Sequence, residues 1–116
     1  MEEADKLIEQ GLLYDFYGGL LTKHQQKIYE EAVYENLSLS EIADLEQISR
    51  QAVSDLLHRT TTALQHYEAQ LGLIRRFEQI RLLTAQLRDL ASQELAPDRI
   101  RAGILQAADQ IEQELR

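Results

Sequence analysis

Residues 37–59 read LSLSEIADLEQISRQAVSDLLHR, and this stretch decides the fold. Ser38 and Glu41 form a Ser-x-x-Glu capping box, which predicts a short helix over about residues 39–46. Ser49 then predicts the N-cap of a further helix. Two short helices that follow each other so closely must pack at a steep angle, as they do in a helix-turn-helix.

The same stretch supplies the packing that such a crossing needs. Ala43 is the small residue that lets the two helix backbones approach each other, and Ile48 fills the turn between them. Val53 and Leu56 then pack the second helix against the first. The sequence therefore predicts an all-α protein with a helix-turn-helix, and a single straight helix or a solvent-exposed Val53 would contradict this prediction.

The second helix, which begins at Arg50, carries a polar outer face of the kind that enters the DNA major groove. Arg can bind guanine, and Gln can bind adenine, through two hydrogen bonds. The Ser at the N-cap and the backbone amides of the first turn can donate hydrogen bonds to a phosphate. The predicted nucleic-acid-binding residues are Ser49, Arg50, Gln51, Ser54, Asp55, His58 and Arg59. A three-helix packing unit with a solvated polar face is the alternative, because the same spacing occurs in helical hairpins that bind nothing.

Helices are predicted on the N-terminal side as well. Apolar residues at 3.6-residue spacing predict an amphipathic helix over about residues 3–20. Thr22 and Gln25 form another capping box, which predicts a helix over about residues 23–36. Strand signals are absent, since no sustained alternation of apolar and polar residues occurs.

The C-terminal half predicts a long helix and a shorter one. No Pro interrupts residues 50–93, and Gly72 is the only Gly in them. Apolar residues step by four and three over residues 53–74, as in a heptad seam, and the seam then slips. Pro97 fits the first position of a last helix. The two helices can form a hairpin within one chain or pair with a second copy, and both alternatives fit.

We expect a helix-turn-helix domain over residues 1–66 and a helical association region over residues 67–116. The apolar stripe of the second region favours a homodimer through the long C-terminal helices. This stripe consists of Ile74, Phe77, Ile80, Leu87 and Leu90. Arg81 and Arg88, seven residues apart, are interpreted as flanking a partner helix rather than as phosphate contacts.

The charge distribution limits the partners. The net charge is −8, from 12 Lys and Arg against 20 Asp and Glu. Residues 1–49 carry this entire excess, whereas residues 50–116 hold equal numbers of Arg and acidic residues. An acidic first part disfavours nonspecific attraction to nucleic acid or anionic lipid, so any nucleic-acid contact must use a local cluster of Arg.

Several function classes lack their signatures. The chain has no Cys, no P-loop, no His-Glu-x-x-His motif and no nucleophile elbow, and its His residues are too scattered for a metal site. We therefore expect a protein that is not an enzyme and has no metal, cofactor or small-molecule substrate. No apolar run is long enough for a membrane, and the first residues do not resemble a signal peptide, which favours the cytoplasm.

Three blocks of this sequence resemble the YlxM-type helix-turn-helix proteins of bacteria over roughly residues 10–80. The first block is YDFYGGLLT at residues 14–22, followed by Gln25 or Gln26. The second block comprises Ser38, Leu39, Glu41-Ile42-Ala43 and residues 48–53, and the third comprises Thr60, Leu64, Tyr67-Glu68 and Leu71. The second block is also similar to region 4 of sigma factors, which reads a promoter element.

The resemblance implies a sigma-region-4-like, winged-helix-like DNA-binding bundle with a long C-terminal helix. Family members are usually encoded beside the signal recognition particle GTPase and its receptor, which implies a regulatory or accessory role in that pathway, with DNA or RNA as partner. The alternative is a protein-interaction module that binds signal recognition particle proteins without nucleic acid, with an acidic patch at Glu30, Glu31 and Glu35 as the docking surface. The usual helix-turn-helix has an apolar residue and then Gly or Asn before the residue that fills the turn, whereas this sequence has Glu46 and Gln47 there. Leu45 is expected to replace the lost packing.

Overall fold

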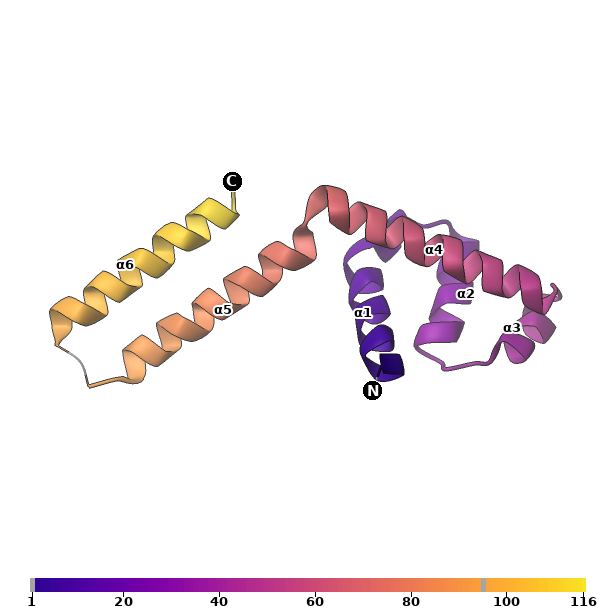
Figure 1. The fold of residues 1–116 in the computed structure, drawn as a ribbon, viewed down its shortest axis with the longest axis horizontal. Helices are drawn as coiled ribbons and strands as arrows, with labels where there is room; N and C mark the ends of the chain where they lie inside the picture. The colour runs from indigo at the N-terminus through magenta and orange to yellow at the C-terminus, as the bar shows by residue number, and fades with distance from the viewer. Residues whose placement is uncertain (1, 95) are drawn as a thin grey trace. The chain divides into compact units, whose positions relative to one another are not determined.

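The computed structural model describes residues 2–94 and 96–116, and this part of the chain folds into helices joined by short turns (Figure 1). The helices are α1 (Glu2–Tyr17), the 3-10 turn η1 (Gly18–Leu20), α2 (Lys23–Val33), α3 (Leu39–Glu46), α4 (Arg50–Leu71), α5 (Leu73–Ser92) and α6 (Pro97–Glu114). No strand occurs among the described residues, and the predicted all-α class is confirmed. The expected winged-helix-like form is wrong for them, because a wing is a β-hairpin and requires strands.

Side-chain caps place the starts of α2, α3 and α4 where the sequence predicts them. The Gln25 amide donates to the Thr22 hydroxyl at 3.2 Å, and the Thr22 amide donates to the Gln25 side chain at 2.9 Å. Ser38 and Glu41 make the same reciprocal pair at the start of α3. Ser49 caps α4 with its hydroxyl. Each cap satisfies amide groups that the first helical turn leaves without an intrahelical acceptor, so the caps fix the helix starts.

The end of α4 differs from the prediction. The expected continuous helix over residues 50–93 is wrong, because α4 ends at Leu71 and α5 begins at Leu73. Between them, Gly72 adopts φ 62° and ψ 28°, and its amide donates to the Glu68 carbonyl at 2.8 Å. A glycine in the left-handed conformation ends many helices, since it has no Cβ to strain there. The slip of the apolar seam near residue 74 is therefore the start of a new helix.

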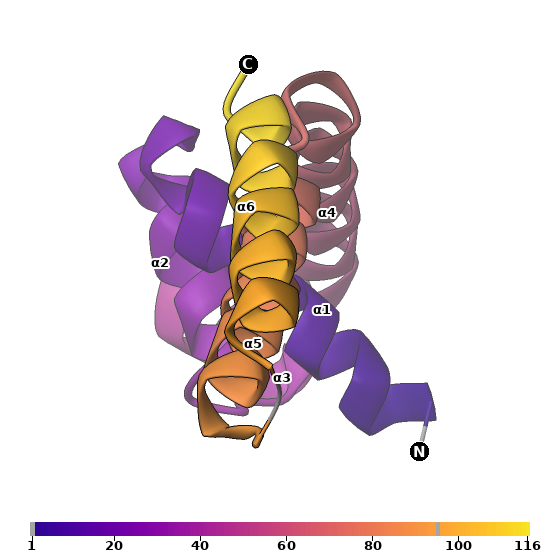
Figure 2. The same cartoon turned by 90° about the vertical axis from the view of Figure 1, so that its left-hand side faces the viewer.

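The first unit ends at Gly72 and contains α1 to α4. In it α1, α2 and α3 pack against α4 (Figures 1 and 2). Its helix-turn-helix core consists of Ile28, Ile42, Ala43 and Val53, with Ile48, Leu56, Leu57, Leu37 and Ala32 packed against it. Val53 is fully buried and Ala43 is 6% exposed. The predicted crossing at Ala43, beside Ile48 and an inward-facing Val53, is confirmed.

Several residues that carry the family resemblance attach α1 to its neighbours. Tyr17 is buried, and its hydroxyl donates to the carboxylate of Glu68 on α4. The Gln26 side chain on α2 donates to the backbone of η1 at 2.8 Å. The ring of Tyr14 stacks on that of Tyr29, with 5.5 Å between the ring centroids. The first and third family blocks therefore serve the packing of this unit.

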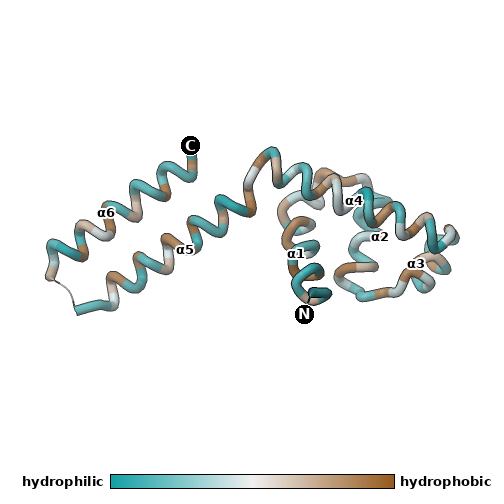
Figure 3. Tube along the Cα trace, viewed as in Figure 1, coloured by the Kyte–Doolittle hydropathy of each residue, from teal (hydrophilic) through white to brown (hydrophobic). Residues whose placement is uncertain are grey.

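The second unit begins at Leu73 and contains α5 and α6. The two helices pair as an antiparallel hairpin within one chain (Figure 1). Apolar residues recur at intervals along both of them (Figure 3). Only Leu83 and Ala107 are buried among the described residues of this unit. Arg75 and Glu114 form a salt bridge between the two helices, with 3.2 Å between the charged atoms.

Candidate nucleic-acid interface

The turn between α3 and α4 keeps its geometry despite an unusual residue. Gln47 takes the left-handed conformation, with φ 56° and ψ 44°. The amides of Gln47 and Ile48 both donate to the Ala43 carbonyl, that of Ile48 at 3.1 Å, which is a Schellman-type helix end. A side chain in this conformation costs about 1 kcal/mol that Gly would not. The departure at Gln47 therefore strains the turn without removing it.

The departure at Glu46 is accommodated by polar contacts between α2 and α3. The Glu46 side chain is only 9% exposed and forms a salt bridge with Lys27 at 3.2 Å. Glu31 is buried beside it, and burial first, then the Glu46 carboxyl, raise the pKa of Glu31. The expectation that Leu45 restores the packing is wrong, because Leu45 is 61% exposed. Charged side chains of α2 and α3 thus pack where the usual helix-turn-helix has an apolar residue.

The N-terminal end of α4 has the features of an anion-binding helix start. The Ser49 hydroxyl accepts a hydrogen bond from the Ala52 amide at 3.0 Å. The amides before Ala52 have no intrahelical acceptor, and the helix dipole favours negative charge near them. Arg50 and Gln51 follow and are exposed. This is the end of a recognition helix that reaches base edges in helix-turn-helix proteins.

Six of the predicted residues form two adjacent stripes along α4, because each stripe repeats every fourth residue. The first stripe is Arg50, Ser54 and His58, and the second is Gln51, Asp55 and Arg59. In the second stripe the Gln51 side chain donates to the Asp55 carboxylate at 2.9 Å, and Arg59 Nε donates to the Asp55 backbone carbonyl at 3.4 Å. To bind a base, the Gln51 side chain would have to give up its hydrogen bond to Asp55.

The first stripe borders a groove of about 460 Å³ between α4, α1 and the start of α3. Ser54 and His58 line it from α4, and Lys6 and Gln10 line it from α1. Sequence reasoning missed Lys6 and Gln10, because only the tertiary packing of α1 against α4 brings them to the candidate site. The one available signal was the place of Lys6 on the polar side of its helix.

The structure thus presents the predicted residues as one continuous surface. Ser54 is half-buried and the other six are exposed. Two Arg side chains and Lys6 supply positive charge, while Asp55 opposes it. Such a surface can donate hydrogen bonds to phosphates and to base edges.

Residues 2–94 and 96–116 contain neither a metal-binding cluster nor a membrane-spanning helix. No three His, Cys, Asp or Glu side chains gather there in a way that could hold a metal ion. None of the helices in this part of the chain combines the length and the apolar character that crossing a membrane requires.

Comparison with known proteins agrees with this geometry. Residues 4–101 match the model of the family described as "UPF0122: Putative helix-turn-helix protein, YlxM / p13 like". A UPF0122 protein of Geobacillus kaustophilus is 35% identical over 108 residues, which are 93% of this chain and 98% of that protein. A UPF0122 protein of Shouchella clausii is 44% identical over 84 residues, which are 72% and 77% of the two chains. The chain belongs to the YlxM/p13-like helix-turn-helix family.

Proposed function

We propose that this protein binds nucleic acid through the first half of α4, with DNA as the first candidate and RNA as the second. The proposed contacts are Ser49, Arg50, Gln51, Ser54, Asp55, His58 and Arg59, joined by Lys6 from α1. The observation that supports this most is the polar surface itself, which starts at a capped helix end on a buried helix-turn-helix core. Family membership favours a binding role over a catalytic one.

The charge of the first unit predicts modest affinity. Up to Gly72 the chain holds five Lys and Arg against thirteen Asp and Glu. Attraction to phosphate must therefore come from the few cations on the α4 surface. If Arg50, Arg59 and Lys6 each neutralise one phosphate, the logarithm of the affinity falls with the logarithm of salt concentration with a slope of about −3.

The test is a salt titration of the full chain against fluorescent duplex DNA and single-stranded RNA. We expect measurable binding at low salt and a slope of about −2 to −3. The double variant Arg50→Ala/Arg59→Ala should lose most of the affinity and reduce the slope by about 2. The matched control is Arg99→Ala/Arg101→Ala, which removes the same charge from exposed positions of α6. Absence of binding to every nucleic acid at low salt would overturn the proposal.

A regulatory or accessory role in the signal recognition particle pathway, in the cytoplasm, is the finer part of this proposal. It is supported by the resemblance to the YlxM-type proteins alone. As a homodimer the protein would present two α4 helices, and DNA half-sites would be spaced to match them. Measuring binding to the host's signal recognition particle GTPase and receptor, each purified, tests the link directly, and no binding to either would contradict it.

The second candidate is a protein-interaction module, favoured by an acidic groove of about 430 Å³ on α2. It is lined by Lys27, Glu30, Glu31, Tyr34 and Glu35. Glu31 is 7% exposed, and its Oε1 has no hydrogen-bond partner. Under this candidate, basic side chains of a partner protein would pair with the exposed carboxylates of Glu30 and Glu35. The variant Glu30→Gln/Glu35→Gln should weaken binding to the signal recognition particle proteins under this candidate and leave it unchanged under nucleic-acid binding alone.

A further inference from the structure

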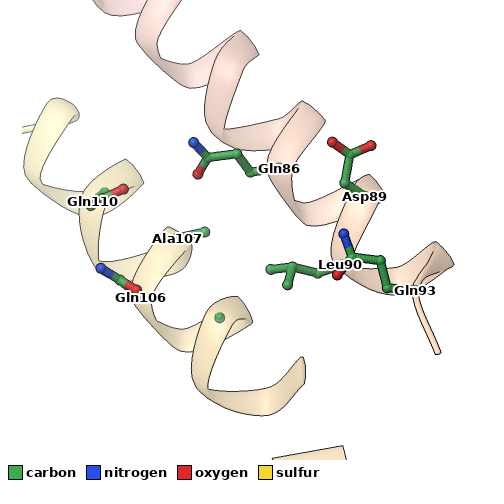
Figure 4. Close-up of a pocket in the computed structure, with 8 residues that line it drawn as sticks. Gln86, Asp89, Leu90, Gln93, Gln106, Ala107 and Gln110 are labelled. Carbon is green, nitrogen blue, oxygen red and sulfur yellow. The ribbon is translucent and has the colours of Figure 1, made fainter. Parts of the chain in front are cut away.

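The hairpin of α5 and α6 has two faces of different character. One face is hollowed, with a groove of about 480 Å³ whose lining comes from both helices (Figure 4). Four glutamines line this groove: Gln86 on α5, Gln93 just beyond the end of α5, and Gln106 and Gln110 on α6. We call this surface the glutamine face; Asp89 adds a further polar side chain to it, and Leu90, Gly103 and Ala107 form its floor between the helices. Leu82 precedes Gln86 by one turn and lies on the same side of α5, where it is 53% exposed.

The opposite face is apolar. On α5 its residues follow one another at intervals of four and three, and they are Ile80, Thr84, Leu87 and Ala91. On α6 and its C-cap the same intervals give Ile104, Ala108, Ile111 and the C-cap residue Leu115. In an antiparallel pair these two stripes turn to the same side of the hairpin, away from the glutamines. We call this surface the apolar face. It leaves Ile104 41% exposed and Leu115 69% exposed.

Two helices alone do not bury this face. Leu83 and Ala107 lie between α5 and α6 and are the buried residues of the described hairpin. A segment this short seldom holds a stable core by itself, and oligomerisation is one of the usual remedies. A second hairpin laid on the apolar face would turn two helices into a four-helix bundle with the glutamine faces outside.

The charges of the two helices indicate a second copy of this chain as the occupant. α5 carries four Arg against two acidic residues, and α6 carries two Arg against four acidic residues. A twofold axis parallel to the helices places α5 of one copy beside α6 of the other, antiparallel, so helices of opposite net charge adjoin at both contacts. The hairpin as a whole holds seven basic and seven acidic residues, so two copies carry no net repulsion there.

We propose that the apolar face of α5 and α6 is the interface of a homodimer, in which two hairpins form a four-helix bundle. The inference specifies the surface of the homodimer named under the proposed function. The dimer does not depend on nucleic acid, so its mass can be measured without any. Loss of the dimer and loss of nucleic-acid binding are then separate results.

The experiment compares two matched substitutions in the full chain by sedimentation equilibrium. Ile104→Glu places a carboxylate on the apolar face, and Leu82→Glu places one at a comparably exposed position beside the glutamine face. We expect the unchanged protein to be a dimer. Ile104→Glu should raise the Kd of the dimer at least a hundredfold, because it removes a buried apolar side chain from two copies. Leu82→Glu should change the Kd less than about threefold.

Circular dichroism of both variants checks that the helices persist. If Ile104→Glu loses helix signal, the comparison uses Ile104→Gln and Leu82→Gln, which add no charge. A monomeric mass for the unchanged protein at 100 µM overturns the proposal. So does a dimer that resists both substitutions at position 104, or one that Leu82→Glu dissociates as strongly as Ile104→Glu.

Discussion

The two units of this chain stabilise their helices in different ways. From Glu2 onward the first unit buries nine apolar side chains, among them Tyr17, Ile28 and Leu64, while the described hairpin buries Leu83 and Ala107. The first unit also carries the whole net charge of −8, whereas the hairpin from Leu73 onward is neutral. A bundle with its own core can tolerate strong charge, since apolar burial dominates its stability.

The two units therefore depend on different contacts for their stability. The first unit should unfold with a midpoint that does not depend on protein concentration, because its core lies within one chain. Under the proposed dimer, the hairpin should unfold at a midpoint that rises with protein concentration, because a second copy would complete its core. Each of the following predictions tests one side of this contrast.

The largest expected effect comes from the core of the first unit. Ile42→Ala should lower the free energy of unfolding by about 3 kcal/mol, because it leaves a cavity where α2, α3 and α4 meet. Leu45→Ala on the same helix is the control, since Leu45 is 61% exposed, and it should cost less than about 0.5 kcal/mol. Urea denaturation measures both. If both variants lost a similar amount of unfolding free energy, the contrast between the two units would fail, because the stability of the first unit would then not depend on its core.

The second prediction concerns a polar group inside that core. Thr60 is fully buried on α4, and its hydroxyl has no hydrogen-bond partner. Thr60→Val keeps the shape and removes the unsatisfied oxygen, so it should raise the free energy of unfolding by about 1 kcal/mol. Thr62→Val, at an exposed position, should change it by less than about 0.5 kcal/mol. A destabilised Thr60→Val would contradict the prediction and indicate that the hydroxyl is hydrogen-bonded in solution.

The third prediction concerns the turn before α4. Gln47→Gly should raise the free energy of unfolding by about 0.7 kcal/mol, because glycine relieves the left-handed strain but gains freedom in the unfolded chain. Asn36→Gly provides the control, since Asn36 also has positive φ, of 55°, and Asn tolerates this conformation well. Its gain should be smaller. Thermal melts of both variants measure these changes. A shift confined to the transition of the first unit would sharpen the contrast, and a larger gain from Asn36→Gly would refute the explanation given for Gln47.

The smallest expected effect is on pH dependence. The pKa of Glu31 is raised above 4.5, by burial and by Glu46, with Lys27 opposing and Glu35 adding to the shift. The folded state therefore holds this proton more tightly than the unfolded state, and the stabilisation is complete below pH 4.5 and is lost as pH rises through the raised pKa. Glu31→Gln should flatten this fall in the stability of the first unit, as measured by urea midpoints across the mildly acidic range.

Asp44→Asn is the control for this pH profile, since Asp44 is exposed on α3. It should leave the fall between acidic and neutral pH as it is in the unchanged protein. If Glu31→Gln shows the same profile as the unchanged protein, the raised pKa of Glu31 is wrong.

Local signals predicted much of the first unit. Ser38 and Ser49 mark the starts of α3 and α4 to the residue, because capping is a contact between neighbours in sequence. The break at Gly72 was missed, since a single glycine within an apolar seam is compatible with a continuous helix at a cost of about 1 kcal/mol. Its left-handed conformation depends on how each helix packs, which periodicity does not report.

The candidate site, too, could be predicted from the sequence only in part. The exposed stripe of Gln51, Asp55 and Arg59 follows from helical periodicity and from a fixed helix start. The place of Lys6 beside His58 could not be predicted, because it requires the packing of α1 against α4. Neither could the burial of Glu46, whose side chain takes an apolar place only because Lys27 reaches it from α2.

The aromatic stacking in the first unit has a practical consequence for watching this molecule unfold. The five tyrosines are Tyr14, Tyr17, Tyr29, Tyr34 and Tyr67, and the chain has no Trp. All of them precede Gly72, so tyrosine fluorescence reports on the first unit alone. Backbone signals sum over the helices of both units. Recording the two signals in one melt therefore separates the two transitions without attaching any dye.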